Sequence, residues 1–229
     1  MKFPDLLPGI FLKRINRFTA LIEVMSGEKV QAYVPTTGRL TGVLRRGGRV
    51  WLASATTQNR KLHYDLVLAE LEEDGLCSVN AALANQLFEE ALLNEALGAF
   101  PYKVIQREVS FGASRLDFRL TDHDHVCWVE VKSVTYGQDG VGMFPDAPTE
   151  RGQKHLQELA SLTAKGDRAS VVFIAQRGDA VRFAPYKAID PEFTAILKQV
   201  HAQGVDARAY RCDVSLERVE IAEEIPVEL

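Results

Sequence analysis

Three polar side chains on two neighbouring predicted strands could carry out metal-dependent chemistry. Residues 115–120 and 126–132 alternate apolar and polar side chains on either side of a polar turn, a pattern typical of a β-hairpin. Because successive side chains of a strand point to opposite faces, Glu130 and Lys132 share one face of the second strand. If the two strands pair, Asp117 of the first strand converges with them on one patch.

Two neighbouring carboxylates can hold a hard divalent cation, Mg²⁺ or Mn²⁺, through their oxygen atoms. The cation lowers the pKa of a bound water and stabilises charge on an attacked phosphate, while a nearby lysine can orient the water. Asp117, Glu130 and Lys132 therefore predict a phosphodiesterase centre with the two carboxylates as metal ligands. The alternative is a surface hairpin on which Glu130 and Lys132 form an exposed ion pair that contributes almost nothing to stability.

A predicted helix over residues 80–97 adds a further carboxylate. Asn80 is a suitable N-cap for this helix, and Gly98 is a suitable end. Helical spacing places Glu90 in a row of leucines, where a carboxylate is costly unless it is paired, bound to metal or at the edge of a cleft. Glu90 is therefore a candidate functional residue, and a half-exposed helix glutamate is the alternative.

The composition is ordinary for a globular protein. The 229 residues are 46% hydrophobic and 25% charged, which predicts a substantial core in one large domain or two small ones. Three widely separated cysteines without a CxxC pair indicate neither a disulfide framework nor a zinc site, and they fit a reduced, cytoplasmic setting. We expect no signal peptide and no membrane span, because prolines and charges interrupt the N-terminus and no apolar run is long enough.

Charge is distributed unevenly along the chain. The net charge is −4, but residues 1–61 hold eleven Lys or Arg against three acidic residues, a local charge of +8. A basic module on an acidic body predicts DNA as a partner, bound mainly through its phosphate backbone. Chance asymmetry of a solvated surface is the alternative. The candidate phosphate contacts in this module are Lys13, Arg14, Arg17, Arg39, Arg45 and Arg46.

Pattern and charge divide the chain into residues 1–78 and residues 79–229. Several short runs of β-forming residues in the first part suggest a small barrel of the OB type, a common oligonucleotide-binding scaffold. The glycine-punctuated loop 36–42 could cradle a phosphate, and an ordinary tight loop is the alternative. We expect strands at 11–24, 30–34, 50–55 and 62–68, and a connector at 70–75.

The second part alternates strands with helices, which predicts an α/β domain with a mixed central sheet. Residues 136–151 are rich in Gly and Pro and predict a long irregular loop. The helix expected next begins near Arg151, and because helix N-termini favour anions, Gln153 and Lys154 are candidate phosphate contacts. The other expected elements are strands at 104–111, 171–175 and 205–210 and helices at 152–165 and 190–204.

These motifs resemble the sugar fermentation stimulation protein A family of prokaryotes, and the similarity runs nearly end to end. The matching motifs are Lys13-Arg14, Thr37-Gly38, Thr41-Gly42, Asn80, Asn85, Ser114-Arg115-Leu116-Asp117-Phe118, Glu130-Val131-Lys132-Ser133-Val134-Thr135 and Thr149-Glu150-Arg151-Gly152-Gln153-Lys154-His155-Leu156. The chain departs from the family pattern in loop 36–42, where an expected Asn and Met are missing, so a specific role of that loop is in doubt.

The resemblance implies an OB-like domain joined to a domain similar to PD-(D/E)xK nucleases. It implies DNA binding linked to the regulation of sugar metabolism, especially of maltose, and a nuclease-like centre with a Mg²⁺ or Mn²⁺ cofactor. The implied centre contains Glu90, Asp117, Glu130 and Lys132, with Glu90 as a third or water-mediated ligand and Gln153 in support. It also makes Arg151 and Lys154 candidate nucleic-acid contacts. Two functions stay open: a DNA-binding regulator that does not cleave, and an active metal-dependent nuclease of DNA or RNA.

Overall fold

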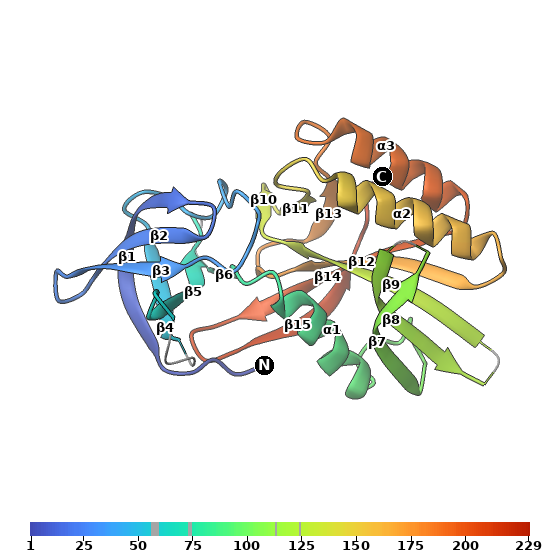
Figure 1. Cartoon of the computed structure of the whole chain (residues 1–229), viewed down its shortest axis with the longest axis horizontal. Coiled ribbons are helices and arrows are strands. Elements are labelled where there is room, and N and C mark those ends of the chain that lie inside the picture. The colour runs from blue at the N-terminus through green and yellow to red at the C-terminus, as the bar shows by residue number, and fades with distance from the viewer. Residues whose placement is uncertain (56–59, 73–74, 113, 124) are drawn as a thin grey trace.

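A β-barrel and a larger α/β domain lie side by side in the computed structural model (Figure 1). The structure describes residues 1–55, 60–72, 75–112, 114–123 and 125–229. Among these residues, none of the helices is long and apolar enough to cross a membrane.

The N-terminal domain is a five-stranded barrel that closes through pairing of its third and fifth strands. The expected single run at 11–24 is in fact two antiparallel strands, because the chain reverses at Arg17 and Phe18. The expected connector at 70–75 instead joins β5 to a short strand that pairs with it. The strands are β1 (Leu6–Asn16), β2 (Thr19–Val24), β3 (Lys29–Tyr33), β4 (Arg49–Ser54), β5 (Tyr64–Glu70) and β6 (Leu76–Ser78).

The C-terminal domain is built on a six-stranded mixed sheet of order β15-β14-β12-β9-β8-β7, with helices on both faces. α1 packs on one face, and α2 and α3 pack on the other (Figure 1). The strands of this sheet are β7 (Val104–Phe111), β8 (Ser114–Asp122), β9 (His125–Val134), β12 (Arg168–Ala175), β14 (Asp206–Val214) and β15 (Val219–Ile225). The helices are α1 (Leu83–Leu93), α2 (Glu150–Thr163) and α3 (Pro191–Ala202).

Helix boundaries agree with the sequence where a capping side chain fixes them. Asp190 accepts a hydrogen bond from Phe193 N at 2.8 Å and caps α3 as predicted. The predicted cap of α1 is wrong, since Asn80 closes the turn before the helix by accepting a hydrogen bond from Ala82 N at 3.0 Å. α1 therefore begins later than predicted.

The region expected to be a long irregular loop contains two strands. β10 (Tyr136–Gln138) and β11 (Val141–Phe144) form a hairpin, and β13 (Arg182–Pro185) pairs with β11 to complete a three-stranded sheet. The hairpin turn at 139–140 and the stretch from 145 to 149 lack helix or strand before α2 begins.

The predicted hairpin of β8 and β9 is present, but its pairing becomes irregular near Asp117. Phe118 and Leu120 pack into the core beside α1, whereas Leu116 packs into the core beneath α2 and α3. Strict alternation along β8 would put all three on one face, but the ladder between β8 and β9 ends at the pair of Phe118 and Val129. The strand thus departs from its partner at Asp117.

Loop 36–42 of the barrel is hydrogen-bonded to the α/β domain. Asp146 accepts a hydrogen bond from Leu40 N at 3.0 Å. The backbone at Gly38 approaches so closely that a Cβ there would lie 2.5 Å from the Asp146 carboxylate, and one at Gly42 would lie 2.6 Å from the Tyr136 ring. In loop 36–42 the Leu40 amide therefore binds a carboxylate of this protein and the Gly38 amide binds Thr36 Oγ1 at 3.1 Å, which argues against the phosphate cradle that the sequence allowed.

Replacing Asp146 with Ala should loosen this attachment of the barrel. The change leaves Leu40 N without its acceptor in a half-buried position, which should lower the free energy of unfolding by about 1–3 kcal/mol. Proteolysis of loop 36–42 should become faster. The Asp146→Asn variant retains an acceptor oxygen and serves as the control, so equal protease sensitivity of Ala and Asn variants would contradict the role of this hydrogen bond.

Candidate active site

A cleft of about 810 Å³ lies between the two domains. The barrel contributes Arg17 and the start of loop 36–42, and the α/β domain contributes the ends of β8 and β9 and the start of α2. Asp117, Glu130 and Lys132 all line this cleft, so the structure confirms that the hairpin brings the three together.

Each of the two carboxylates is fixed by defined hydrogen bonds. Asp117 accepts bonds from Val131 N and from the side-chain amide of Asn85, both at 2.8 Å. Glu130 Oε1 accepts a hydrogen bond from Lys132 Nζ at 2.6 Å. The side chains of Glu130 and Lys132 are only 4% and 11% exposed, which rejects the alternative of an exposed surface pair.

His155 is a functional candidate that the sequence analysis missed. It lies on α2 with its side chain 3% exposed, and its Nδ1 contacts Glu130 Oε1. Its Nε2 lies 3.4 Å from Arg151 Nε, at the edge of the cleft. The signal was present in the helical spacing, because His155 shares a row with Leu159 and Leu162 and so had to face the core.

The structure does not bring Glu90 into this cluster. Glu90 lines a different cavity beside Arg107 and contacts the Met1 amino group at 2.9 Å, with its side chain 43% exposed. On α1 it is Asn85 that reaches Asp117. The alternative of a half-exposed helix glutamate therefore describes Glu90, which lies five residues beyond Asn85 on α1.

Gln153 and Lys154 also lie outside the cluster. The side-chain amide of Gln153 donates to Asp190, the capping residue of α3, at 3.1 Å. Lys154 is half exposed and lies 3.9 Å from Glu158. Gln153 therefore stabilises the start of α3, and Lys154 lies on the surface of α2. Neither side chain contacts the carboxylates.

The predicted cationic contacts of the barrel divide into two groups. Arg14 is half-buried and donates to the carbonyl oxygens of Gly38 and Arg39 at 2.8 and 2.9 Å, so it holds loop 36–42 from within. Arg45 lies 3.2 Å from Glu72. The exposed members of the set are Lys13, Arg17, Arg39 and Arg46.

The two carboxylates have oppositely shifted pKa values. Burial and the neighbouring charge of Glu130 raise the pKa of Asp117 to about 6. Burial also opposes ionisation of Glu130, but the charge of Lys132 and the hydrogen bond and charge of His155 outweigh it and lower the pKa of Glu130 to about 2. Glu130 is therefore the permanent anion of the cluster.

The donor set suits a hard cation that keeps several waters. Glu130 Oε2 is buried and has no hydrogen-bond partner among the described residues, although it is a carboxylate oxygen. No group of three or more His, Cys, Asp or Glu side chains in the described part of the chain is arranged around a metal. Asp117 and Glu130 could thus supply two ligands to such a cation, with water or substrate completing an octahedral shell.

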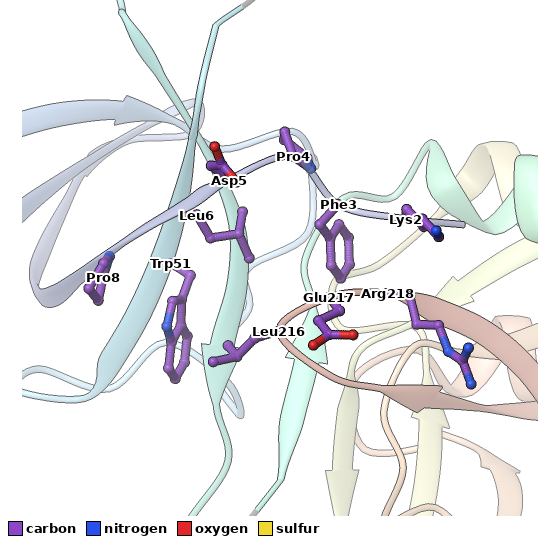
Figure 2. A pocket seen from close by; sticks show the side chains of 10 residues that line it. All are labelled: Lys2, Phe3, Pro4, Asp5, Leu6, Pro8, Trp51, Leu216, Glu217 and Arg218. Atoms are coloured by element: carbon purple, nitrogen blue, oxygen red, sulfur yellow. The ribbon is translucent and has the colours of Figure 1, made fainter.

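A second cavity, of about 610 Å³, lies where the N-terminal segment crosses from the barrel to the turn between β14 and β15 (Figure 2). Phe3 N donates to Glu217 O at 2.8 Å, which ties the segment to that turn. Apolar groups of Phe3, Leu6, Trp51 and Leu216 face this space. It is a junction between the domains and lies apart from the carboxylates.

Comparison with known proteins assigns both domains to one class. Residues 12–79 match the family model described as "SfsA N-terminal OB domain", and residues 82–218 match "Sugar fermentation stimulation protein RE domain". The barrel is therefore an OB domain, and its partner is the RE domain that accompanies it.

Full-length relatives identify the family. A sugar fermentation stimulation protein homolog of Moorella thermoacetica is 43% identical over 229 residues, covering 98% of this chain and 97% of that protein. The homolog of Thermoanaerobacter sp. (strain X514) is 40% identical over 96% of each chain. The solved structure of Pyrococcus furiosus SfsA in complex with Ca²⁺ is 31% identical with a TM-score of 0.91, over 100% of this chain and 98% of the other. This chain belongs to the sugar fermentation stimulation protein family.

Replacing Asp117 with Asn should remove a pH-dependent loss of stability from the metal-free protein. An acid whose pKa is raised by folding favours the native state when protonated, and this advantage is lost as pH rises from about 4 to about 6. The Asn variant does not ionise, so between pH 4.5 and pH 7.5 its free energy of unfolding should gain about 1–2 kcal/mol relative to that of the wild type.

Urea denaturation in EDTA at pH 4.5 and pH 7.5 measures this difference. Asp122→Asn, on the same strand near the hairpin turn, is the control and should show no such pH dependence. A difference between Asp117→Asn and wild type that is the same at both pH values would contradict the raised pKa.

Proposed function

We propose that this protein binds nucleic acid and that its interdomain cleft hydrolyses phosphodiester bonds with a divalent cation. The observation that supports this most directly is the buried cluster of Asp117, Glu130 and Lys132, in which one carboxylate oxygen of Glu130 has no partner among the described residues. A buried anionic oxygen without a donor is costly, and a cation removes that cost. The arrangement matches what the PD-(D/E)xK resemblance implies for this hairpin.

Asp117 and Glu130 would hold the cation, Mg²⁺ or Mn²⁺. When bound, it supplies a water of lowered pKa and neutralises charge on the attacked phosphate. Ca²⁺ in the Pyrococcus furiosus relative supports a site for a hard, oxygen-liganded cation in this family.

The chain's own residues have separate roles in this proposal. Lys132 uses one N–H for Glu130, and an ammonium group has two more with which to orient a water or contact a phosphate oxygen. Arg151 reaches the cleft from the start of α2 and can hold a second phosphate oxygen. His155 is a positioning residue, since its contact with Glu130 Oε1 leaves Oε2 as the oxygen available to a cation.

A second candidate is a nucleic-acid-binding regulator that does not cleave. It is favoured by one observation, which is that Lys132 and His155 together compensate the charge of Glu130 without a cation. A role in regulating sugar metabolism, which the family name suggests, would follow from binding alone. The two candidates differ in whether metal and Lys132 matter to the products formed.

Calorimetric titration with Mn²⁺ tests the metal site. Wild type should bind Mn²⁺ and gain thermal stability, because the ion binds only the folded state. The double variant Asp117→Asn with Glu130→Gln should lose at least tenfold in affinity, whereas Asp122→Asn should bind like wild type. Unchanged Mn²⁺ binding by the double variant would remove these residues from any metal site.

Replacing Lys132 with Ala separates cleavage from binding. Removing a donor that stabilises transition-state charge should lower the cleavage rate about 100-fold or more. Affinity for uncut DNA should fall only slightly, because it depends mostly on the barrel. Lys198→Ala, which removes an exposed lysine on α3, is the matched control.

The measurement uses labelled single- and double-stranded DNA and RNA with Mn²⁺ or with EDTA. If wild type forms no metal-dependent products on any substrate, or if Lys132→Ala cuts as fast as wild type, the catalytic proposal fails and the regulator remains.

A further inference from the structure

Four side chains of the barrel form a continuous cation–aromatic ladder, which we define as Arg17, Phe18, Tyr33 and Arg60. The rings of Phe18 and Tyr33 are nearly parallel, with an interplanar angle of 20° and centroids 6.2 Å apart. The guanidinium of Arg17 lies 5.6 Å from the Phe18 centroid, and that of Arg60 lies 4.9 Å from the Tyr33 centroid. The two rings therefore lie next to each other between two guanidinium groups, of which Arg60 also forms an ion pair with Asp65 at 2.8 Å.

The ladder begins at the cleft. Arg17 lines the same cavity as Asp117, Glu130 and Lys132, and it also contacts Phe18. A chain that lies along the ladder from Arg60 to Arg17 is thereby led toward the carboxylates. This continuity joins a surface feature of the barrel to a site on the other domain.

Hydrogen bonds fix the turn that carries Phe18, the exposed ring of the ladder. Phe18 occupies the turn between β1 and β2, and its side chain is 42% exposed. Its backbone N–H donates to Asn16 Oδ1 at 2.9 Å, and its carbonyl accepts a hydrogen bond from Val34 N at 2.9 Å. Arg14 contacts the carbonyl oxygen of Arg17 from within. The turn is thus fixed at several points while its ring faces solvent, an arrangement suited to binding a flat apolar partner.

We propose that nucleic acid enters the cleft as a single strand whose bases stack on this ladder. This inference rests on the nucleic-acid substrate proposed above and specifies its form. Unpaired bases expose their faces and stack on aromatic rings and on guanidinium planes, whereas base pairing and stacking conceal those faces within a duplex. Loops and strands of an OB barrel are common places for such contacts.

Electrostatics favours the same occupant over an uncharged apolar partner. The ladder lies on the domain with the local charge of +8, and Lys13 and Arg39 of that domain are exposed. A polyanion with flat apolar bases matches both the charges and the rings. A duplex would match the charges alone and would gain nothing from Phe18.

The test compares binding of single-stranded and double-stranded DNA of one sequence by fluorescence anisotropy. It is performed in EDTA, so neither a bound metal nor cleavage affects the result. Phe18→Ala should weaken single-strand binding about fivefold or more, as expected for loss of one base–aromatic stack, and should change duplex binding less than twofold. Phe18→Trp should restore single-strand binding. Met25→Ala removes a side chain that is 77% exposed in the same domain and is the matched control.

A second readout follows the stacking itself. A single-stranded oligonucleotide with 2-aminopurine at successive positions should show quenched fluorescence at one or two positions with wild type and not with Phe18→Ala. Loss of single-strand and duplex binding in equal proportion, or no loss of either, would overturn the ladder while leaving the proposed function intact. Wild type that binds neither form of DNA, nor single-stranded RNA, would overturn both proposals.

Discussion

The burial of two like-charged carboxylates side by side is the constraint on which the rest of the site depends. Asp117 and Glu130 repel each other in a poorly solvated place, and the chain surrounds them with Lys132, His155, Asn85 and a backbone N–H. A buried charge costs several kcal/mol unless such partners are present. The compensation is incomplete, since one oxygen of Glu130 has no donor among the described residues and the pKa of Asp117 is raised. The incompletely compensated charge therefore lowers the stability of the metal-free protein, and a bound cation would offset this loss.

Hydrogen bonds between polar groups also couple the barrel to the α/β domain. Asp146 lies in the short stretch that precedes α2, and it binds a backbone amide of the barrel loop that forms one wall of the cleft. Arg14 holds that loop from the opposite side through its carbonyl oxygens. Asp146, together with Arg14, which the sequence suggested as a phosphate contact, thus fixes the position of the barrel loop relative to the carboxylates. The consequence is that a partner bound by the barrel meets the site at a defined place.

Local patterns in the sequence predicted what depends on local geometry. The alternation around Asp117 and Glu130 fixes which side chains share a strand face, so the hairpin and its cluster were predictable. The two-domain class followed from strand spacing and from the resemblance to the family. Glu90 was misplaced because the turn of α1 that meets β8 depends on tertiary packing, which helical spacing alone does not reveal. His155 could have been found, since it shares a row on α2 with Leu159 and Leu162.

The sequence did not reveal where each arginine side chain points. That orientation decides whether its charge faces solvent or pairs with a group of this protein. Composition counts every cation of residues 1–61 toward a phosphate-binding surface, but Arg14 turns inward and others pair with carboxylates of their own domain. The cations that stay exposed are fewer, and among them Arg17 lies both beside an aromatic ring and at the edge of the cleft. The net charge of residues 1–61 therefore overstates the charge available to the proposed nucleic-acid partner, which gives the apolar rings more weight in the proposal. Because those rings belong to the barrel and the carboxylates to the other domain, the proposed affinity and the proposed chemistry would reside in different parts of the fold and could change independently.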